Sequence, residues 1–338
     1  MSPFGRQAAP GSMSIPILEG QRFLAALAAA RGRASRPYRA LYSSWLGGLV
    51  VKPELMLVPL DDHMVHRGDA VFETFKAVAG NLYNLEAHLV RLAASAASLR
   101  LTIPVTRSEL TDLVVATVRV GACRDAVVRI FVSRGPGSLS CRPSDALGPQ
   151  IYIVTADPPT PARERFPNGV SVCLSAYPAK EPAFATAKSC NYLLNALMDQ
   201  EADDAKTDFC LALDRRGFVA ECATESLGLV SPDRRLLFPR LDGILRGTTM
   251  MRVAELARGL VKDGMLTGVS FEDIPAAALA EAREILICGT TLDVLPVVCL
   301  AGRPVGRGRP DGPVAQRLND LLTRDILENR ALHTPVFP

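Results

Sequence analysis

Residues 184–230 read FATAKSCNYLLNALMDQEADDAKTDFCLALDRRGFVAECATESLGLV. Lys188 is followed by an apolar run with helical period, and then by two strand-like runs joined by an Asp-Arg-Arg-Gly turn. The second strand-like run ends on Glu221. A helix followed by a hairpin can bring the lysine and the carboxylate into one pocket. We therefore place the chemistry of the chain between Lys188 and Glu221.

Lys188 has neighbours that suit a nucleophilic amine. The chain has only six lysines, and this one lies among small residues just before the apolar run. Partial desolvation there disfavours the ammonium and leaves the neutral amine that a Schiff base with an aldehyde cofactor requires. Taken alone, the residue fits a solvated lysine at a helix start better. The neighbouring residues therefore decide the interpretation.

The run KSCNYL at residues 188–193, with Glu221 downstream, resembles the catalytic core of the class IV aminotransferases. These are the fold-type IV pyridoxal-phosphate enzymes. The resemblance implies that Lys188 forms the Schiff base with pyridoxal 5'-phosphate and moves the substrate proton. It also implies that Tyr192 bonds the phenolic oxygen of the cofactor and that Glu221 pairs with the protonated pyridine nitrogen. A carboxylate there keeps the ring cationic and able to accept electrons.

A second motif lies upstream, where residues 61–74 read DDHMVHRGDAVFET. It resembles the small-domain signature of the same family. By that resemblance Arg67 binds the cofactor phosphate, a role that suits its fixed charge and forked donors. Phe72 lines the substrate side of the pocket. A helical pattern follows and carries His88 and Arg91 three residues apart on one face, and we interpret that pair as structural.

Two Gly-Thr-Thr triplets complete the phosphate site by resemblance. One opens an expected helix at residues 250–261, where backbone N–H groups face an anion. The other follows an expected strand at residues 284–288. A single triplet is a weak signal, because glycine and threonine occur in many caps and turns. The residues assigned are Gly247, Thr248, Thr249 and Thr290 for the phosphate, with the backbones of Thr291 and Leu292 for the substrate carboxylate.

The chain departs from the family pattern at two positions. Ser226 stands where the family usually has asparagine, and Met250 stands where an arginine often follows the phosphate threonines. Both changes alter the residues around Glu221 and the phosphate. Arg129, on an expected strand at residues 127–133, either reaches a substrate carboxylate or is an exposed strand residue, and the sequence leaves both interpretations open.

Substrate choice rests on smaller features. The loop after residue 133 lacks the Pro-Arg-x-His clamp of bacterial D-amino acid transaminases and the glycine- and arginine-rich loop of bacterial deoxychorismate lyases. Residues 42–48 and 121–125 resemble the plant branch of the family, with which both activities are associated. We expect a ping-pong transaminase that takes a D-amino acid donor. The alternatives are a 4-amino-4-deoxychorismate lyase that eliminates pyruvate, a branched-chain L-amino acid aminotransferase and a non-catalytic protein that binds the cofactor.

The length of 338 residues and the hydrophobic content of 48% allow two domains. The resemblance implies an α/β fold of type IV, with the active site between a small and a larger α/β domain. Helices are expected at residues 17–33, 85–99 and 107–120, the last capped by Thr106 or Ser108, and a strand at residues 55–58. The expected parts are a partly disordered N-terminal extension (1–37), a small domain (38–157), a proline-stiffened linker (158–168) and a large cofactor-binding domain (169–338).

Composition limits the other partners. A net charge of +3 without a basic tract speaks against nucleic acid. The eight cysteines form no Cys-x-x-Cys pair and no metal-ligand spacing with the histidines, so we expect reduced thiols, no metal and a cytoplasmic protein. No apolar run is long enough for a membrane span. The arginine-rich N-terminal region is a helical extension or, alternatively, an organelle transit segment. The resemblance also implies a homodimer.

Overall fold

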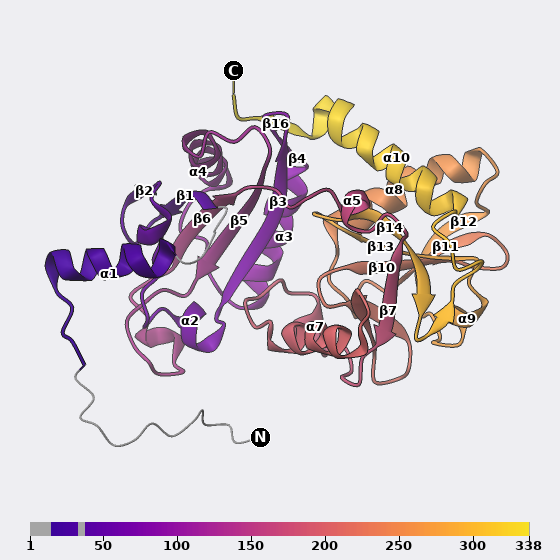
Figure 1. Ribbon diagram of the computed structural model, residues 1–338, viewed down its shortest axis with the longest axis horizontal. Coiled ribbons are helices and arrows are strands. Elements are labelled where there is room, and N and C mark those ends of the chain that lie inside the picture. Colours follow the sequence, from indigo (N-terminus) through magenta and orange to yellow (C-terminus); the bar gives the residue numbers. More distant parts are fainter. Residues whose placement is uncertain (1–14, 33–37, 338) are drawn as a thin grey trace.

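The computed structural model describes residues 15–32 and 38–337. Two β-sheets with packed helices lie side by side, the first built mainly from the N-terminal half of the chain and the second from the C-terminal half (Figure 1). The expected α/β class is confirmed. The expected N-terminal extension (1–37) is described only over residues 15–32, and the rest of it lies outside the described residues.

The first sheet has the strand order β16-β4-β3-β5-β6-β1-β2, and every neighbouring pair in it is antiparallel. Helices α3 and α4 pack against it around a core that includes Phe75, Leu92 and Val114. The strands are β1 (Tyr38–Ser43), β2 (Gly48–Val50), β3 (Ala70–Val78), β4 (Asn81–Tyr83), β5 (Ala126–Ser133), β6 (Gln150–Ala156) and β16 (His333–Pro335).

The helices of this first half largely follow the sequence pattern. α3 (Leu85–Ser98) and α4 (Arg107–Val120) lie where they were expected. Thr106 caps α4, and its side chain and that of Glu109 form a reciprocal capping box. The N-terminal helix α1 (Gly20–Gly32) is shorter than expected. The strand expected at residues 55–58 is wrong, because the short 3-10 helix η1 (Pro53–Leu55) begins at a proline, which lacks a donor for a sheet.

The second sheet has the order β12-β11-β10-β13-β14-β7-β8-β9, with β15 beside β14. Its centre is buried on both faces, and all five residues of β10 are buried. Helices α8 and α10 contribute to one core cluster, and α9 to another. The strands are β7 (Val170–Leu174), β8 (Phe209–Leu213), β9 (Val219–Cys222), β10 (Ser226–Val230), β11 (Arg235–Pro239), β12 (Gly268–Glu272), β13 (Glu284–Gly289), β14 (Asp293–Leu300) and β15 (Arg303–Pro304).

Helices and short turns complete the second half of the chain. They are α5 (Ala162–Arg165), α6 (Pro182–Ala185), α7 (Leu193–Ala205), α8 (Thr248–Lys262), α9 (Ala278–Glu281), α10 (Pro313–Glu328) and η3 (Arg330–Leu332), while α2 (His63–Arg67) and η2 (Pro143–Asp145) precede them. One expectation needs correction here. The chain after α10 returns to the first sheet as β16 beside β4, so residues 169–338 do not all belong to the second half (Figure 1).

Polar contacts tie the two halves together. The hydroxyl of Tyr83 on β4 donates to Asp325 on α10, and Arg252 on α8 donates to the same carboxylate. Lys76 on β3 forms an ion pair with Asp293 at the start of β14. Within the described residues, no helix has the length and apolar character needed to cross a bilayer. No group of His, Cys, Asp or Glu side chains suited to a metal ion occurs among them either.

Candidate active site

The segment that carries Lys188 is held by the first sheet. The backbone N–H of Phe72 on β3 donates to the carbonyl of Lys188 at 2.9 Å, and the N–H of Cys190 donates to the carbonyl of Ala70 at 2.7 Å. The N–H of Lys188 itself donates to the hydroxyl of Ser95 on α3 at 3.0 Å. Residues 188–190 therefore run alongside the start of β3, so the lysine lies where the two halves meet.

The structure explains why the second motif has a glycine at position 68. It has φ +66°, and a Cβ there would lie 3.2 Å from the backbone of Asn191. A left-handed backbone and a close approach both favour glycine. The motif thus lets the end of α2 pack against the segment that carries Lys188.

The amine of Lys188 lies between two aromatic side chains. Its Nζ is 3.1 Å from the hydroxyl of Tyr192 and 4.5 Å from the centroid of the Phe72 ring. The lysine is 9% exposed, and burial lowers its pKa to about 8, with the nearby charge of Arg91 acting in the same direction. With a pKa of about 8, roughly a tenth of the amine is neutral at pH 7 and about half at pH 8. The structure thus brings Lys188, Tyr192 and Phe72 together.

Glu221 lies near the end of β9, facing the same region. Burial of its carboxyl group raises its pKa to about 7. The N–H of Leu245, which donates to the carboxylate at 3.3 Å, and the charges of Lys188 and Arg91 act in the opposite direction and lower this pKa. The side-chain amide of Asn195 on α7 donates to the carbonyl of Ala223, just beyond the glutamate. This bond ties helix to hairpin, which is the arrangement expected from residues 184–230.

Arg91 takes a position that the sequence analysis did not give it. From α3 it donates two hydrogen bonds to Glu73, at 2.7 and 2.8 Å, and a third to the carbonyl of Arg246 at 3.0 Å, beside the first Gly-Thr-Thr turn. Its charge lowers the pKa of both Lys188 and Glu221. Arg91 is therefore a cation of the site, and the interpretation of it as merely structural was incomplete.

A buried network orients Arg91. Glu73 is fully buried on β3, and it contacts Nδ1 of His88 at 2.7 Å as well as the guanidinium. Burial by itself would raise the pKa of Glu73, but Arg91 and His88 lower it to about 2. Nε2 of His88 lies 3.3 Å from the hydroxyl of Thr248. The network runs from β3 through α3 to the start of α8.

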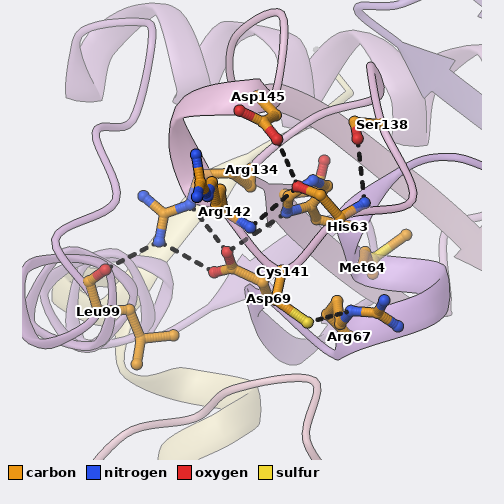
Figure 2. Close-up of polar contacts among 12 residues, drawn as sticks. His63, Met64, Arg67, Asp69, Leu99, Arg134, Ser138, Cys141, Arg142 and Asp145 are labelled. Atoms are coloured by element: carbon orange, nitrogen blue, oxygen red, sulfur yellow. Dashed lines mark hydrogen bonds and ion pairs between the residues drawn. The ribbon is translucent and has the colours of Figure 1, made fainter.

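The structure does not bring Arg67 into this group. Its guanidinium is exposed at the end of α2 and donates to Sγ of Cys141 at 3.0 Å (Figure 2). It also donates to the carbonyl of Leu139 at 2.7 Å. Nearby, Arg134 pairs with Asp69. Arg67 thus supports the loop that follows β5, whereas Arg91 contacts the residue before the first Gly-Thr-Thr turn.

The structure brings the two Gly-Thr-Thr turns together. Thr248, Thr249 and Thr290 line one small cavity together with His88. Gly247 precedes α8, and a Cβ there would overlap the hydroxyl of Ser226. The first N–H groups of a helix have no partner within it, so the start of α8 suits an anion. The hydroxyl of Thr290 donates to the carbonyl of Thr74 at 3.3 Å, which fixes the second turn against β3.

A larger cavity of about 710 Å³ opens beside the second turn. Arg129, an exposed residue of β5, lines it with Thr291 and Phe131, and Phe131 stacks on Phe72 with ring centroids 5.8 Å apart. Leu292 is different. Its side chain is buried in the core, and its N–H donates to the carbonyl of Gly289. This N–H is therefore already bonded within the turn.

Comparisons with known proteins agree with this geometry. A family model described as amino-transferase class IV matches residues 70–299. The D-amino-acid transaminase, chloroplastic, of Arabidopsis thaliana is 35% identical over 319 residues, which cover 93% of this chain and 83% of that protein. A putative branched-chain-amino-acid aminotransferase of Methanocaldococcus jannaschii is 31% identical over 82% of this chain and 93% of that protein. The crystal structure of the T.th. branched-chain amino acid aminotransferase with pyridoxamine 5'-phosphate has a TM-score of 0.80 and 26% identity, covering 89% and 99% of the two chains.

Fold and site together define a pyridoxal-phosphate enzyme of fold type IV. The chain belongs to the class IV aminotransferase family. It is accordingly a transferase, and its cofactor is pyridoxal 5'-phosphate.

The residues present fit that cofactor. An aldehyde needs a neutral amine, a ring nitrogen that becomes protonated needs a carboxylate, and a phosphate needs a guanidinium and free N–H groups. Lys188, Glu221 and Arg91 supply these three groups around one site. Tyr192 adds a hydroxyl beside the amine.

Proposed function

We propose that this class IV aminotransferase runs a ping-pong transamination from a D-amino acid to a keto acid through Lys188. The observation that carries the proposal is the buried amine of Lys188, 3.1 Å from the Tyr192 hydroxyl, with its pKa lowered to about 8. The D-amino acid donor is supported by the names of two relatives, the Arabidopsis thaliana protein and the D-alanine aminotransferase of Bacillus licheniformis, which is 28% identical.

Each residue of the site has a defined task in this reaction. The bound cofactor supplies an electron sink conjugated to the α-carbon of the substrate. Lys188 would hold the cofactor through its amine, and the same amine, when free and neutral, would take the α-proton of the substrate and return it one carbon away. Tyr192 would donate a hydrogen bond to the phenolic oxygen of the cofactor. Glu221, when ionised, would hold the proton on its ring nitrogen.

The cofactor phosphate would be held by Arg91 and the two threonine turns. Arg91 offers a positively charged guanidinium, and the buried carboxylate of Glu73 fixes the orientation of this group. Thr249 and Thr290 line the same cavity as His88, and the hydroxyl of Thr248 faces that histidine. The assignment of Arg67 to the phosphate is replaced by Arg91, because only Arg91 has contacts that reach the first turn.

The substrate would occupy the cavity of about 710 Å³. Arg129 and the backbone of Thr291 suit its carboxylate. Phe131, which lines the cavity and stacks on Phe72, suits an apolar side chain. A branched-chain L-amino acid is the second candidate donor. It is favoured by the apolar wall of the cavity and by the name of the Methanocaldococcus jannaschii relative.

The test is a half-reaction without a keto acid acceptor. Excess D-alanine should abolish the visible absorbance of the bound cofactor and release pyruvate, measured with lactate dehydrogenase. L-Leucine is the comparison donor, and Lys188→Ala is the control for bound cofactor without turnover. Reaction with L-leucine alone would exclude the D-amino acid donor. Failure of both donors, in protein with bound cofactor, would contradict transamination of these substrates.

Two expectations beyond the site stay predictions. We infer a homodimer, supported by exposed apolar side chains on the β1–β2 hairpin, where Trp45 and Leu46 are 48% and 49% exposed. Light scattering should then give twice the chain mass of 36.3 kDa. The name of the Arabidopsis thaliana relative keeps organelle targeting of this chain open beside the cytoplasmic expectation. Fusion of residues 1–37 to a fluorescent protein would distinguish organelle targeting from a cytoplasmic location by where the fluorescence lies in the cell.

A further inference from the structure

A second lysine, Lys180, approaches the site from an anchored segment between β7 and α6. The N–H of Ala179 donates to the carbonyl of Leu213 at 2.8 Å. The carbonyl of Glu181 accepts the N–H groups of Phe184 and Ala185, and its carboxylate pairs with an exposed arginine. The residues on both sides of Lys180 are thus fixed, so its side chain extends from a defined backbone.

The ammonium of Lys180 lies against the ring of Tyr192. Its Nζ is 4.5 Å from the ring centroid, whereas Nζ of Lys188 is 5.5 Å from the same centroid and 3.1 Å from the hydroxyl. A cation in contact with an aromatic ring is attracted to it, more strongly where water is partly excluded. Lys180 is only partly exposed. The phenol therefore has two lysines beside it.

Lys180 also acts on Glu221. Burial lowers the pKa of Lys180, while the negative charge of Glu221 raises it. In return the charge of Lys180 lowers the pKa of Glu221 and that of Lys188. The cations that face Glu221 are Lys188, Lys180 and Arg91, and the other titratable groups coupled to it are the side chains of Tyr192 and Cys222.

These cations are not equivalent during a reaction. Arg91 is already paired with Glu73 through two hydrogen bonds, although its charge still lowers the pKa of Glu221. Lys188 has no charge whenever its amine is free to take a proton. Among the described residues no carboxylate forms an ion pair with Lys180, so its charge still acts on Glu221 when the amine of Lys188 is neutral.

We propose that Lys180 is a positioning residue, whose ammonium on the Tyr192 ring keeps Glu221 ionised while the amine of Lys188 is neutral. The inference rests on the proposed function, because it takes Glu221 to face the ring nitrogen of the cofactor. An ionised Glu221 binds the protonated ring, and a protonated Glu221 does not. Removing Lys180 should therefore raise the pH below which the cofactor is lost.

The test is calorimetric binding of pyridoxamine 5'-phosphate to the full-length chain freed of cofactor, from pH 6 to pH 9. This probe has an amine in place of the aldehyde, so it forms no covalent bond with Lys188. For Lys180→Met we expect the acid midpoint of binding to rise by roughly half a pH unit or more. Below the midpoint the affinity should be about threefold weaker than that of the unaltered protein.

Three variants provide the comparison. Lys180→Arg should keep the original midpoint, because the charge and the ring contact remain. Lys180→Gln serves as a second uncharged variant if the methionine protein unfolds. Lys262→Met, at an exposed position in the last turn of α8, should bind as the unaltered protein does. The protonation of pyridoxamine 5'-phosphate itself changes with pH in the same way in every experiment, so it cancels when the variants are compared.

Several outcomes would overturn the inference. An unchanged midpoint, or a loss of affinity that is equal at every pH, would mean that Lys180 only packs against Tyr192. A midpoint shift that persists in a Glu221→Gln background would mean that Lys180 does not act through Glu221. Failure of the unaltered protein to bind the probe would instead contradict the proposed function itself, and the role of Lys180 with it.

Discussion

Replacing Glu73 by glutamine would test whether a buried carboxylate orients the cation of the phosphate site. The side chain is fully buried on β3 and accepts hydrogen bonds from Arg91 while contacting Nδ1 of His88. Glutamine keeps the shape but removes the charge. It leaves the largely buried guanidinium of Arg91 without its counter-charge, which is the costly way to break such a pair.

The pKa of Glu73 gives the size of the effect. Its value falls from 4.5 to about 2, because the contacts with Arg91 and His88 outweigh the cost of burial. That difference corresponds to about 3 kcal/mol of stabilisation of the ionised carboxylate. A depressed pKa stabilises the folded protein above the unfolded value and is lost as the pH falls through the folded value. The contribution is therefore complete above about pH 5 and shrinks toward pH 2.

Urea denaturation at several pH values would measure this. At pH 7 we expect Glu73→Gln to lower the free energy of unfolding by about 3 kcal/mol. The gap to the unaltered protein should narrow as the pH falls below about 4.5. Glu86→Gln, on the exposed face of the same helix as Arg91, is the matched control and should change nothing measurable. Equal stability of the Glu73 variant at pH 7, or a gap that does not narrow in acid, would refute the reasoning.

Three further predictions concern neighbouring residues. Arg91→Gln should weaken the binding of pyridoxamine 5'-phosphate about tenfold or more by calorimetry, whereas Arg67→Gln should leave it nearly unchanged. A larger loss of affinity in the Arg67 variant than in the Arg91 variant would instead assign Arg67 to the phosphate. Because the pKa of Lys188 is about 8, the rate at which added pyridoxal phosphate develops visible absorbance should rise with pH to a midpoint near that value; a midpoint near 10.5 would mean a solvated amine. Gly68→Ala should destabilise the protein more than Gly217→Ala in thermal unfolding, because both glycines have positive φ but only Gly68 has a crowded Cβ position. Equal losses of stability in the two variants would mean that the backbone conformation alone causes the loss and that the crowding at Gly68 costs nothing.

The residues that sequence analysis found best are those whose arrangement is local. Lys188, Tyr192 and Glu221 lie on one helix start and the hairpin after it, and a helical period followed by two strand-like runs defines that unit. Tyr192 and Lys188 are four residues apart, and their contact needs little information from elsewhere in the chain. The capping box of Thr106 is equally local, which is why its position was predicted.

Arg91 was missed because its role depends on contacts distant in sequence. It reaches Glu73, 18 positions away, and the carbonyl of Arg246, 155 positions away. A signal did exist: Glu73 lies on a strand that alternates between buried and partly buried residues from Val71 onward, and it points into the core, where an unpaired carboxylate is costly. A buried glutamate requires a cation, and His88 and Arg91 lie on the next helix. The pairing of β16 with β4 is also long-range, and three residues of strand carry no such signal.

The departure at Met250 changes where the positive charge of the site comes from. The family resemblance leads us to expect an arginine after the phosphate threonines, but Met250 is fully buried in the core beneath α8. A charged side chain there would need a buried partner to be tolerated. The positive potential near Glu221 must then come from other elements. Arg91 supplies it from α3 and is committed to Glu73, which leaves Lys180 as the cation with no carboxylate of its own. The loss of an arginine at one position and the presence of a lysine at another are thus parts of one electrostatic arrangement, and the pH dependence of cofactor binding is where both should be visible.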